Sequence, residues 1–192
     1  DTILAMSNDL AGGQYSISSK LLKENELISF LKSNYQDVYA EKEVTIFGWV
    51  RSNRAQAQFG FLNVNDGSFF EAVQVVYDDK MANFSEISKY RVGVSVLVKG
   101  VVKLTPDMKQ PLELHATCIE MLGDCPENYP IQPKRHTREF LREVAHLRPR
   151  TNLFSAVFRI RSVAAHAIHT YFQERGYIYV HTPLITCADC EG

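Results

Sequence analysis

The chain has 192 residues, of which 45% are hydrophobic and 22% are charged, and its formal net charge is -1 at pH 7. This length allows one or two domains with a real apolar core. A charge near zero gives no overall sign of a nucleic-acid partner, and the absence of any run of about 18 consecutive apolar residues argues against a membrane span.

Residues 1–42 contain one candidate helix. Its apolar positions recur at amphipathic spacing and are Leu21, Leu22, Leu27, Ile28 and Leu31. We expect an extension that packs on the following domain or forms a separate arm. The first residues match neither a secretory signal nor a transit peptide. Because the chain begins at Asp1 and not at Met, we expect a processed, tagged or excised piece.

Residues 43–122 form a predicted small β domain. Apolar side chains alternate over five segments, 44–51, 60–65, 72–77, 95–103 and 112–120. Asn65, Asp66 and Gly67 suit a hairpin turn, and 81–90 suits a short helix between the third and fourth strands. This order is typical of a five-stranded Greek-key OB barrel, a fold that often binds single-stranded nucleic acid. An SH3-like barrel or a purely structural barrel is the alternative.

Two aromatic residues stand out in the second predicted strand. Phe59 and Phe61 flank Gly60, so alternation places both on one face, with the glycine opening space between them. An exposed ring could stack on an unpaired base. Three polar side chains are candidates for reading base edges beside it, namely Arg54, Gln74 and Glu113. The alternative is that all are ordinary strand or surface residues, since aromatics in small barrels usually fill the core.

Residues 123–136 (GDCPENYPIQPKRH) contain three prolines and few apolar residues, which predicts an extended linker that works as a hinge. Basic residues are dense from there to Arg175. They are Lys134, Arg135, Arg138, Arg142, Arg148, Arg150, Arg159, Arg161 and Arg175, against Glu139, Glu143 and Glu174. This segment could face phosphate, or it could be a solvated face or a network of ion pairs.

The last third of the chain predicts a long amphipathic helix followed by a strand. The helix buries one face through Val157, Ile160, Ala164, Ile168, Tyr171 and Phe172. Thr151 or Asn152 can cap its start, and Gly176 can end it. Residues 177–181 are β-branched and aromatic in alternation, and Pro183 stops the strand or places it at an edge.

The four cysteines are Cys118, Cys125, Cys187 and Cys190. Their number and spacing give no disulfide framework, so free thiols in a reducing compartment are expected. Cys187 and Cys190 form a C-x-x-C pair, but a tetrahedral zinc site needs further ligands and none has matching spacing. We therefore expect no metal site.

The wording from HLRPRTN to TPLITCADCEG closely resembles motif 1 of the class II aminoacyl-tRNA synthetases, most of all the asparaginyl branch of subclass IIb. This resemblance implies that residues 137–192 begin an α+β catalytic domain, so the whole fold is mixed, with a barrel first. It further implies a homodimer with Arg161 and Pro183 at the interface. Glu191 matches the family glutamate that receives the substrate's α-amino group. An ordinary core helix packed on a strand is the alternative.

The middle segment is similar to the anticodon-binding barrel of the aspartyl and asparaginyl enzymes. Their first strand reads GWVR, as residues 48–51 do here, followed by an arginine that corresponds to Arg54. The resemblance makes Phe61 the aromatic that stacks on the central anticodon base and Gln74 the amide that reads a base edge. Glu113 matches an acidic residue on the last strand.

The resemblance implies an asparagine-tRNA ligase that uses ATP and magnesium to form an aminoacyl-adenylate and then esterifies its tRNA. The motifs that supply the ATP-binding arginines do not occur in this chain, so we expect it to be inactive alone and to bind no cofactor itself. The other hypotheses are an aspartyl-tRNA synthetase and a non-catalytic OB-fold RNA-binding module. We expect tRNA and asparagine as partners and a cytoplasmic or organellar location.

Overall fold

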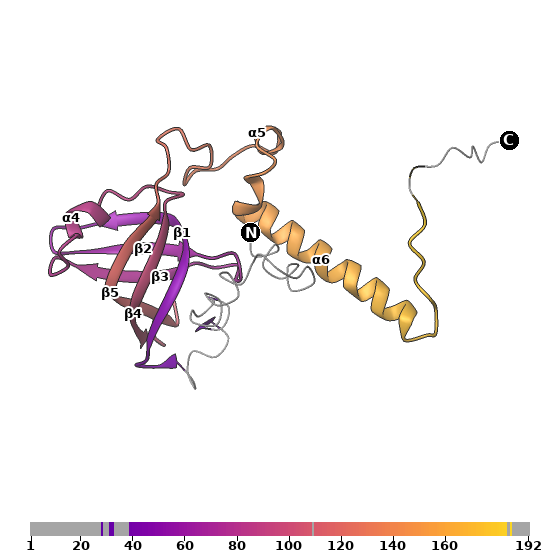
Figure 1. The fold of residues 1–192 in the computed structure, drawn as a ribbon, viewed down its shortest axis with the longest axis horizontal. Coiled ribbons are helices and arrows are strands. Elements are labelled where there is room, and N and C mark those ends of the chain that lie inside the picture. Colours follow the sequence, from indigo (N-terminus) through magenta and orange to yellow (C-terminus); the bar gives the residue numbers. More distant parts are fainter. Residues whose placement is uncertain (1–27, 29–30, 33–38, 109, 184, 186–192) are drawn as a thin grey trace, which may run out of the picture.

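The computed structural model describes residues 28, 31–32, 39–108, 110–183 and 185. Its central unit is a closed barrel of the strands β1 (Glu43–Ala55), β2 (Phe59–Asn65), β3 (Val73–Asp78), β4 (Ser95–Leu104) and β5 (Leu112–Gly123), in the order β1-β2-β3-β5-β4 (Figure 1). β3 and β5 pair in parallel, whereas the other pairs are antiparallel. The predicted five-stranded barrel is confirmed, and closure leaves it without open edges.

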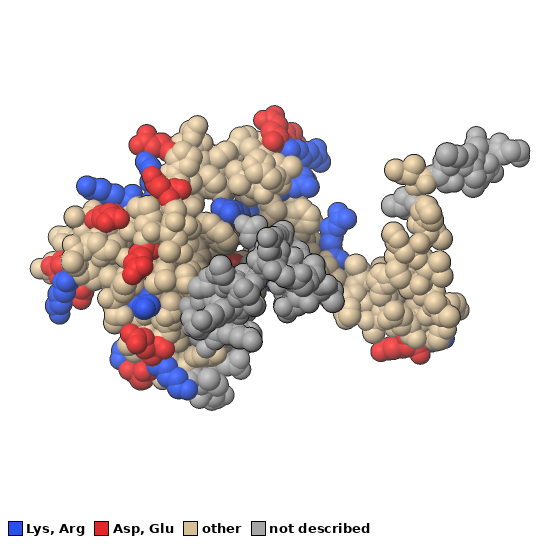
Figure 2. Space-filling model, viewed as in Figure 1, with Lys and Arg blue, Asp and Glu red and all other residues tan. Residues whose placement is uncertain are grey.

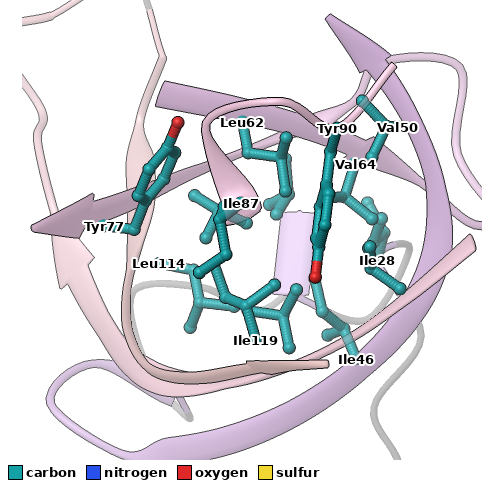
Figure 3. Close-up of a cluster of buried hydrophobic side chains, with 14 of the residues drawn as sticks. Ile28, Ile46, Val50, Leu62, Val64, Tyr77, Ile87, Tyr90, Leu114 and Ile119 are labelled. Atoms are coloured by element: carbon teal, nitrogen blue, oxygen red, sulfur yellow. The ribbon is translucent and has the colours of Figure 1, made fainter. Parts of the chain in front are cut away.

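Alternation of side chains between the inner and outer faces builds the barrel core. On β2, for example, Gly60, Leu62 and Val64 are buried, and the residues between them lie on the outer face. Ile87 from the helix α4 (Phe84–Ile87) joins this cluster, as Figure 3 shows. The helix is shorter than the predicted 81–90. The fully buried Ile28 joins the same cluster, so the described part of the N-terminal extension packs on the barrel.

The turn between β2 and β3 forms where the sequence predicts it. Gly67 has a φ of 84°, a left-handed conformation that glycine adopts without steric cost. The Asn65 side chain accepts a hydrogen bond from the Gly67 amide, at 2.8 Å. Asp66 accepts one from the amide of Ile28, at 2.9 Å, so this turn also holds the N-terminal segment.

The segment after β5 lies against the barrel. Cys125 and Ile131 are 6% and 5% exposed, so the predicted linker is anchored by burial near its start and in its middle. The chain then forms α5 (Arg138–Glu143), which the sequence analysis did not predict, and the 3-10 helix η3 (Arg148–Arg150). Thr137 caps α5 by accepting a hydrogen bond from the Phe140 amide. A hinge function for this segment stays a prediction.

The long helix α6 (Asn152–Gln173) extends away from the barrel (Figure 1). Thr151 caps it by accepting a hydrogen bond from the Phe154 amide at 3.4 Å, and Gly176 follows its end with a φ of 83°. The predicted strand at 177–181 is wrong for this structure, because no described strand lies beside it to form a ladder. Within the part of the chain that the structure describes, no helix is long and apolar enough to cross a membrane.

Candidate nucleic-acid interface

Four neighbouring strands carry the predicted site residues on one outer face of the barrel. Strand pairing sets Arg54 of β1 opposite Phe61 of β2. Phe61 in turn lies opposite Val76 of β3, and Val76 opposite His115 of β5. The neighbouring row on the same outer face, two residues along each strand, crosses the four strands in the same order. It contains Ser52, Asn63, Gln74 and Glu113. We call these two rows, together with Phe59 and Gln110 beside them, the base platform. The structure thus brings Arg54, Phe61, Gln74 and Glu113 together.

The aromatic part of the base platform consists of Phe59 and Phe61. Both rings point outward, since Gly60 and Leu62 between and beside them are buried. The rings meet edge to face, with centroids 5.4 Å apart and planes at 88°. This contact fixes the tilt of the Phe61 ring. The expectation that both rings share a face is therefore met, and they form a surface on which a flat base could stack.

Gly60 has a different role from the one the sequence suggests. A Cβ atom at this position would lie only 2.2 Å from the Tyr77 ring, which packs across the inner side of β2. Tyr77 is 1% exposed, and its hydroxyl donates to Asn53 Oδ1 at 2.8 Å. Burial raises the pKa of Tyr77 and the bond to Asn53 acts in the opposite direction. The glycine therefore makes room on the inner face, for the core, and not between the two phenylalanines.

Polar side chains of the base platform are joined by short hydrogen bonds. Gln74 Nε2 donates to Glu113 Oε1 at 2.6 Å, and Gln110 Nε2 donates to Gln74 Oε1 at 3.0 Å. The second oxygen of Glu113 lies 3.8 Å from His115 Nε2. On the other side of Phe61, Asn63 Nδ2 donates to Ser52 Oγ at 2.7 Å. Such bonds hold amide groups in defined orientations, which a surface that reads base edges requires.

Trp49 and Arg51, of the GWVR segment, lie at a different place, where the barrel meets the following helices. The guanidinium of Arg150 lies 4.7 Å from the centre of the Trp49 ring and donates to the Tyr129 hydroxyl at 3.3 Å. Burial lowers the pKa of Arg51, with Tyr129 raising it and Arg150 lowering it. Arg159 of α6 donates to the Gly67 carbonyl at 2.7 Å. These contacts fix the start of α6 against the barrel.

We expect the Trp49–Arg150 contact to stabilise this junction. Arg150→Ala and Trp49→Leu should each lower the free energy of unfolding, and the double variant should lose about 0.5 to 1 kcal/mol less than the sum of the two. Urea unfolding of the four chains measures this coupling. Arg142→Ala, at an exposed arginine on α5, is the matched control and should be close to neutral. Strictly additive losses would mean that the stacked geometry contributes nothing.

Other basic residues of the predicted cluster also contact rings. Arg148 lies 4.8 Å from the centre of the Phe154 ring and 5.6 Å from that of Phe158. Arg175 lies 3.6 Å from the centre of Tyr171. In the view of Figure 2, acidic and basic side chains are mixed over the barrel and few charges cover the far half of α6. The cluster is therefore not one continuous basic patch in this view.

The remaining predicted site residues lie apart from the base platform. Arg161 is exposed on α6, and Pro183 is exposed beyond it. Glu191 lies outside the described residues, as do Cys187 and Cys190. Cys118 and Cys125 are free thiols. Among the described residues, no group of three or more His, Cys, Asp or Glu side chains could hold a metal ion.

Sequence reasoning missed three residues of this face, Asn63, Gln110 and His115. The alternation of β2 was enough to place Asn63 beside Phe61, and the same rule places His115 two residues after Glu113. Gln110 had no such signal. It belongs to the loop between β4 and β5, and only the closed barrel brings it to Gln74, 36 residues away in sequence.

Residues 44–122 match the family described as "OB-fold nucleic acid binding domain". An "Asparagine--tRNA ligase" of Alkaliphilus oremlandii is 57% identical over 154 residues, which are 80% of this chain and 33% of that protein. An "Asparagine--tRNA ligase" of Acholeplasma laidlawii is 57% identical over 165 residues, 84% of this chain and 36% of that protein. The chain is a relative of the asparaginyl-tRNA synthetases. It spans about a third of the length of these curated relatives.

Solved structures of asparaginyl-tRNA synthetases share this fold. The enzyme of Pyrococcus horikoshii complexed with asparaginyl-adenylate has a TM-score of 0.75 and 25% identity, over 88% of this chain and 38% of that one. The Entamoeba histolytica enzyme in complex with asparaginyl-adenylate has a TM-score of 0.64 and shares the fold, at 20% identity over 77% of this chain and 36% of that one. The similarity extends beyond the residues of the barrel, because 88% of the chain aligns with the first structure.

Proposed function

We propose that this chain recognises the anticodon for an asparagine-tRNA ligase, and that the base platform is the surface that binds it. The observation that carries the proposal is the placement of Arg54, Phe61, Gln74 and Glu113 on adjacent strands of one outer face. A ring for stacking lies beside amide and carboxylate groups that can bond base edges. An exposed guanidinium completes the set and can bond either a base or a phosphate.

The chemistry of the base platform suits unpaired RNA. Sequence-specific RNA recognition acts mostly on loops whose bases are splayed out, so that each offers a flat face and a free edge. Phe61 takes the face of one base, and Gln74, one row away on the next strand, takes its edge. Stacking supplies affinity that varies little with base identity, whereas the hydrogen bonds discriminate between bases. The anticodon loop of a tRNA presents bases in this way.

In the whole enzyme, residues 137–192 begin the catalytic domain and α6 contributes to a homodimer. Several apolar side chains of α6 are exposed in the isolated chain, among them Ile160 at 68% and Val163 at 69%. A surface of this kind in a folded protein marks contact with further protein. Arg161 and Pro183 lie on this same exposed part of the chain. An isologous contact would bring the same α6 face of each subunit to the dimer axis.

The ligase activates asparagine with ATP and magnesium and transfers it to tRNA through the aminoacyl-adenylate. ATP supplies the adenylyl group, and magnesium supplies charge neutralisation at the phosphates. Among the described residues, no set of side chains offers magnesium a site. Glu191 would receive the ammonium group of asparagine through a charge-assisted bond. The free thiols of Cys118 and Cys125 accord with a cytoplasmic location.

Photo-crosslinking tests whether the anticodon reaches the base platform. An anticodon stem-loop RNA with 4-thiouridine at its central anticodon position should crosslink to peptides that contain β2, β3 or β5. The same RNA with 4-thiouridine in the stem is the control and should give little crosslinking there. Crosslinks confined to α5 and α6 would contradict the proposal, because the RNA would then be held by the basic segment after the barrel.

A further inference from the structure

Gln110 is a half-buried link in the polar part of the base platform. Its Nε2 donates to Gln74 Oε1 at 3.0 Å, and Gln74 Nε2 donates to Glu113 Oε1 at 2.6 Å. The two glutamines and the carboxylate therefore form a chain of hydrogen bonds with one direction. Gln110 Oε1 is buried and has no hydrogen-bond partner among the described residues, so the amide of Gln110 is held by its donor end.

The direction of this chain is fixed by Glu113. A carboxylate only accepts hydrogen bonds, so the nitrogen of Gln74, and not its oxygen, must face it. The oxygen of Gln74 then faces Gln110, which must present its own nitrogen. If either amide turned over, two oxygens or two nitrogens would meet. The side-chain amides of a glutamine are otherwise close to two-fold in their preferred torsions, so this restraint determines the orientation.

The loop that carries Gln110 is itself held in place. Thr105, at the other end of the loop, donates through its hydroxyl to the Gln110 carbonyl at 2.6 Å and through its amide to the Pro111 carbonyl at 2.9 Å. These two bonds join the ends of the loop within the protein itself. Preorganisation of this kind reduces the ordering cost of binding.

A fixed amide can distinguish bases that a freely turning amide cannot. Uracil presents a carbonyl oxygen beside a ring N–H, whereas cytosine presents an amino group beside a bare ring nitrogen. Either base can pair with an amide through two bonds, but the order of donor and acceptor is reversed. When stacking on Phe61 and the direction of the RNA backbone fix the pose of the base, one orientation of Gln74 suits uracil and the opposite orientation suits cytosine.

We propose that Gln110 is a positioning residue which, together with Glu113, locks the Gln74 amide and thereby makes the platform select a keto base over an amino base. This inference rests on the proposed function, since it requires that a base of the anticodon faces Gln74. It assigns to Gln110 a selectivity that acts through Gln74. Gln74 keeps one N–H and one oxygen lone pair free for a base. The bonds to Glu113 and Gln110 determine on which side of the base the N–H lies and on which side the oxygen lies.

The test compares anticodon stem-loop RNAs that differ only by uridine or cytidine at the central position, bound to the 192-residue chain at fixed salt. The unmodified chain should prefer uridine by about tenfold or more. Gln110→Met, which removes the donor at similar size, should reduce this preference at least threefold. Glu113 then still holds the Gln74 nitrogen, but the Gln74 oxygen has lost the donor that keeps it in place. Adding Glu113→Gln should bring the preference close to one, because an amide in place of the carboxylate accepts either direction.

The measured quantity is the ratio of the two affinities, which a general loss of stability would not change. Met108→Leu, on the exposed part of the same loop, is the matched control and should keep the full preference. One outcome overturns this inference and leaves the proposed function standing. In it, the unmodified chain distinguishes the two RNAs and needs Phe61 for binding, but the Gln110→Met variant distinguishes them equally well. If the unmodified chain binds both RNAs equally and is indifferent to Phe61→Ala, the proposed function fails first.

Discussion

Phe61→Ala should weaken binding of an anticodon stem-loop with the sequence GUU by about 1 to 3 kcal/mol, at fixed moderate salt. Its ring is the flat surface of the base platform and is held edge to face by Phe59, with centroids 5.4 Å apart. Removing the ring leaves the phosphate contacts in place, so residual binding should persist and depend steeply on salt. Fluorescence anisotropy with labelled RNA measures both the affinity and its salt dependence.

Two variants serve as controls for this prediction. Phe61→Tyr keeps the ring and should retain most of the affinity, whereas Phe59→Ala removes only the edge-on neighbour and should cost less than Phe61→Ala. Thermal unfolding must show that each chain remains folded, since Phe61 is half-buried on β2. An affinity that is unchanged by Phe61→Ala in a folded chain would mean that no base stacks on this ring.

Gly60→Val should lower the free energy of unfolding by about 3 kcal/mol. The new Cβ would meet the Tyr77 ring at 2.2 Å, so the ring must leave its place in the core. Overpacking of this kind typically costs 1 to 3 kcal/mol, and loss of the Tyr77–Asn53 hydrogen bond adds about 1 kcal/mol. The pairing of Gly60 with Tyr77 across β2 and β3 would also be disturbed. Urea unfolding followed by circular dichroism measures the loss.

A second substitution tests the cause. Tyr77→Ala alone should destabilise the barrel by about 3 to 5 kcal/mol, the usual cost of removing a buried aromatic ring. In the double variant, the valine fills part of the vacated space, so the combined loss should be smaller than the sum. Gly123→Ala, where the nearest atom is the Ser95 hydroxyl at 3.0 Å, is the control and should be mild. Simple additivity would show that Gly60 and Tyr77 do not compete for the same space.

The barrel could be predicted from sequence because its strands alternate. Each predicted strand lies within one observed strand or overlaps most of it, and the turn at Gly67 forms as expected. Local patterns decide such elements, because alternation is read over a few residues. The strand predicted for 177–181 does not form, because alternation within a segment is not sufficient for a strand. A strand needs a neighbour to bond, and no described segment supplies one, so local propensity cannot act alone.

The site could be predicted only in part. Phe61 and Gln74 follow from strand position together with the family resemblance, and the structure sets both on one face. Their hydrogen-bond partners depend on long-range closure: Gln110 meets Gln74 only because β3 and β5 pair in parallel. Similarly, the GWVR segment gave no indication that the outward side chains of Trp49 and Arg51 serve the junction with Arg150 and Tyr129. Contacts between distant segments are not encoded in a local pattern.

Binding of the chain to matched tRNAs is the most direct test of the central claim. The tRNAs bear the anticodons GUU, GUC or GUU with its central uridine replaced, and salt is fixed because phosphate contacts alone can mimic affinity. The account predicts a preference for GUU over GUC, and loss of affinity when the central base is changed or Phe61 becomes alanine. Equal binding to all three tRNAs, unaffected by Phe61→Ala, would contradict anticodon recognition by this face and leave only a general electrostatic attraction to RNA.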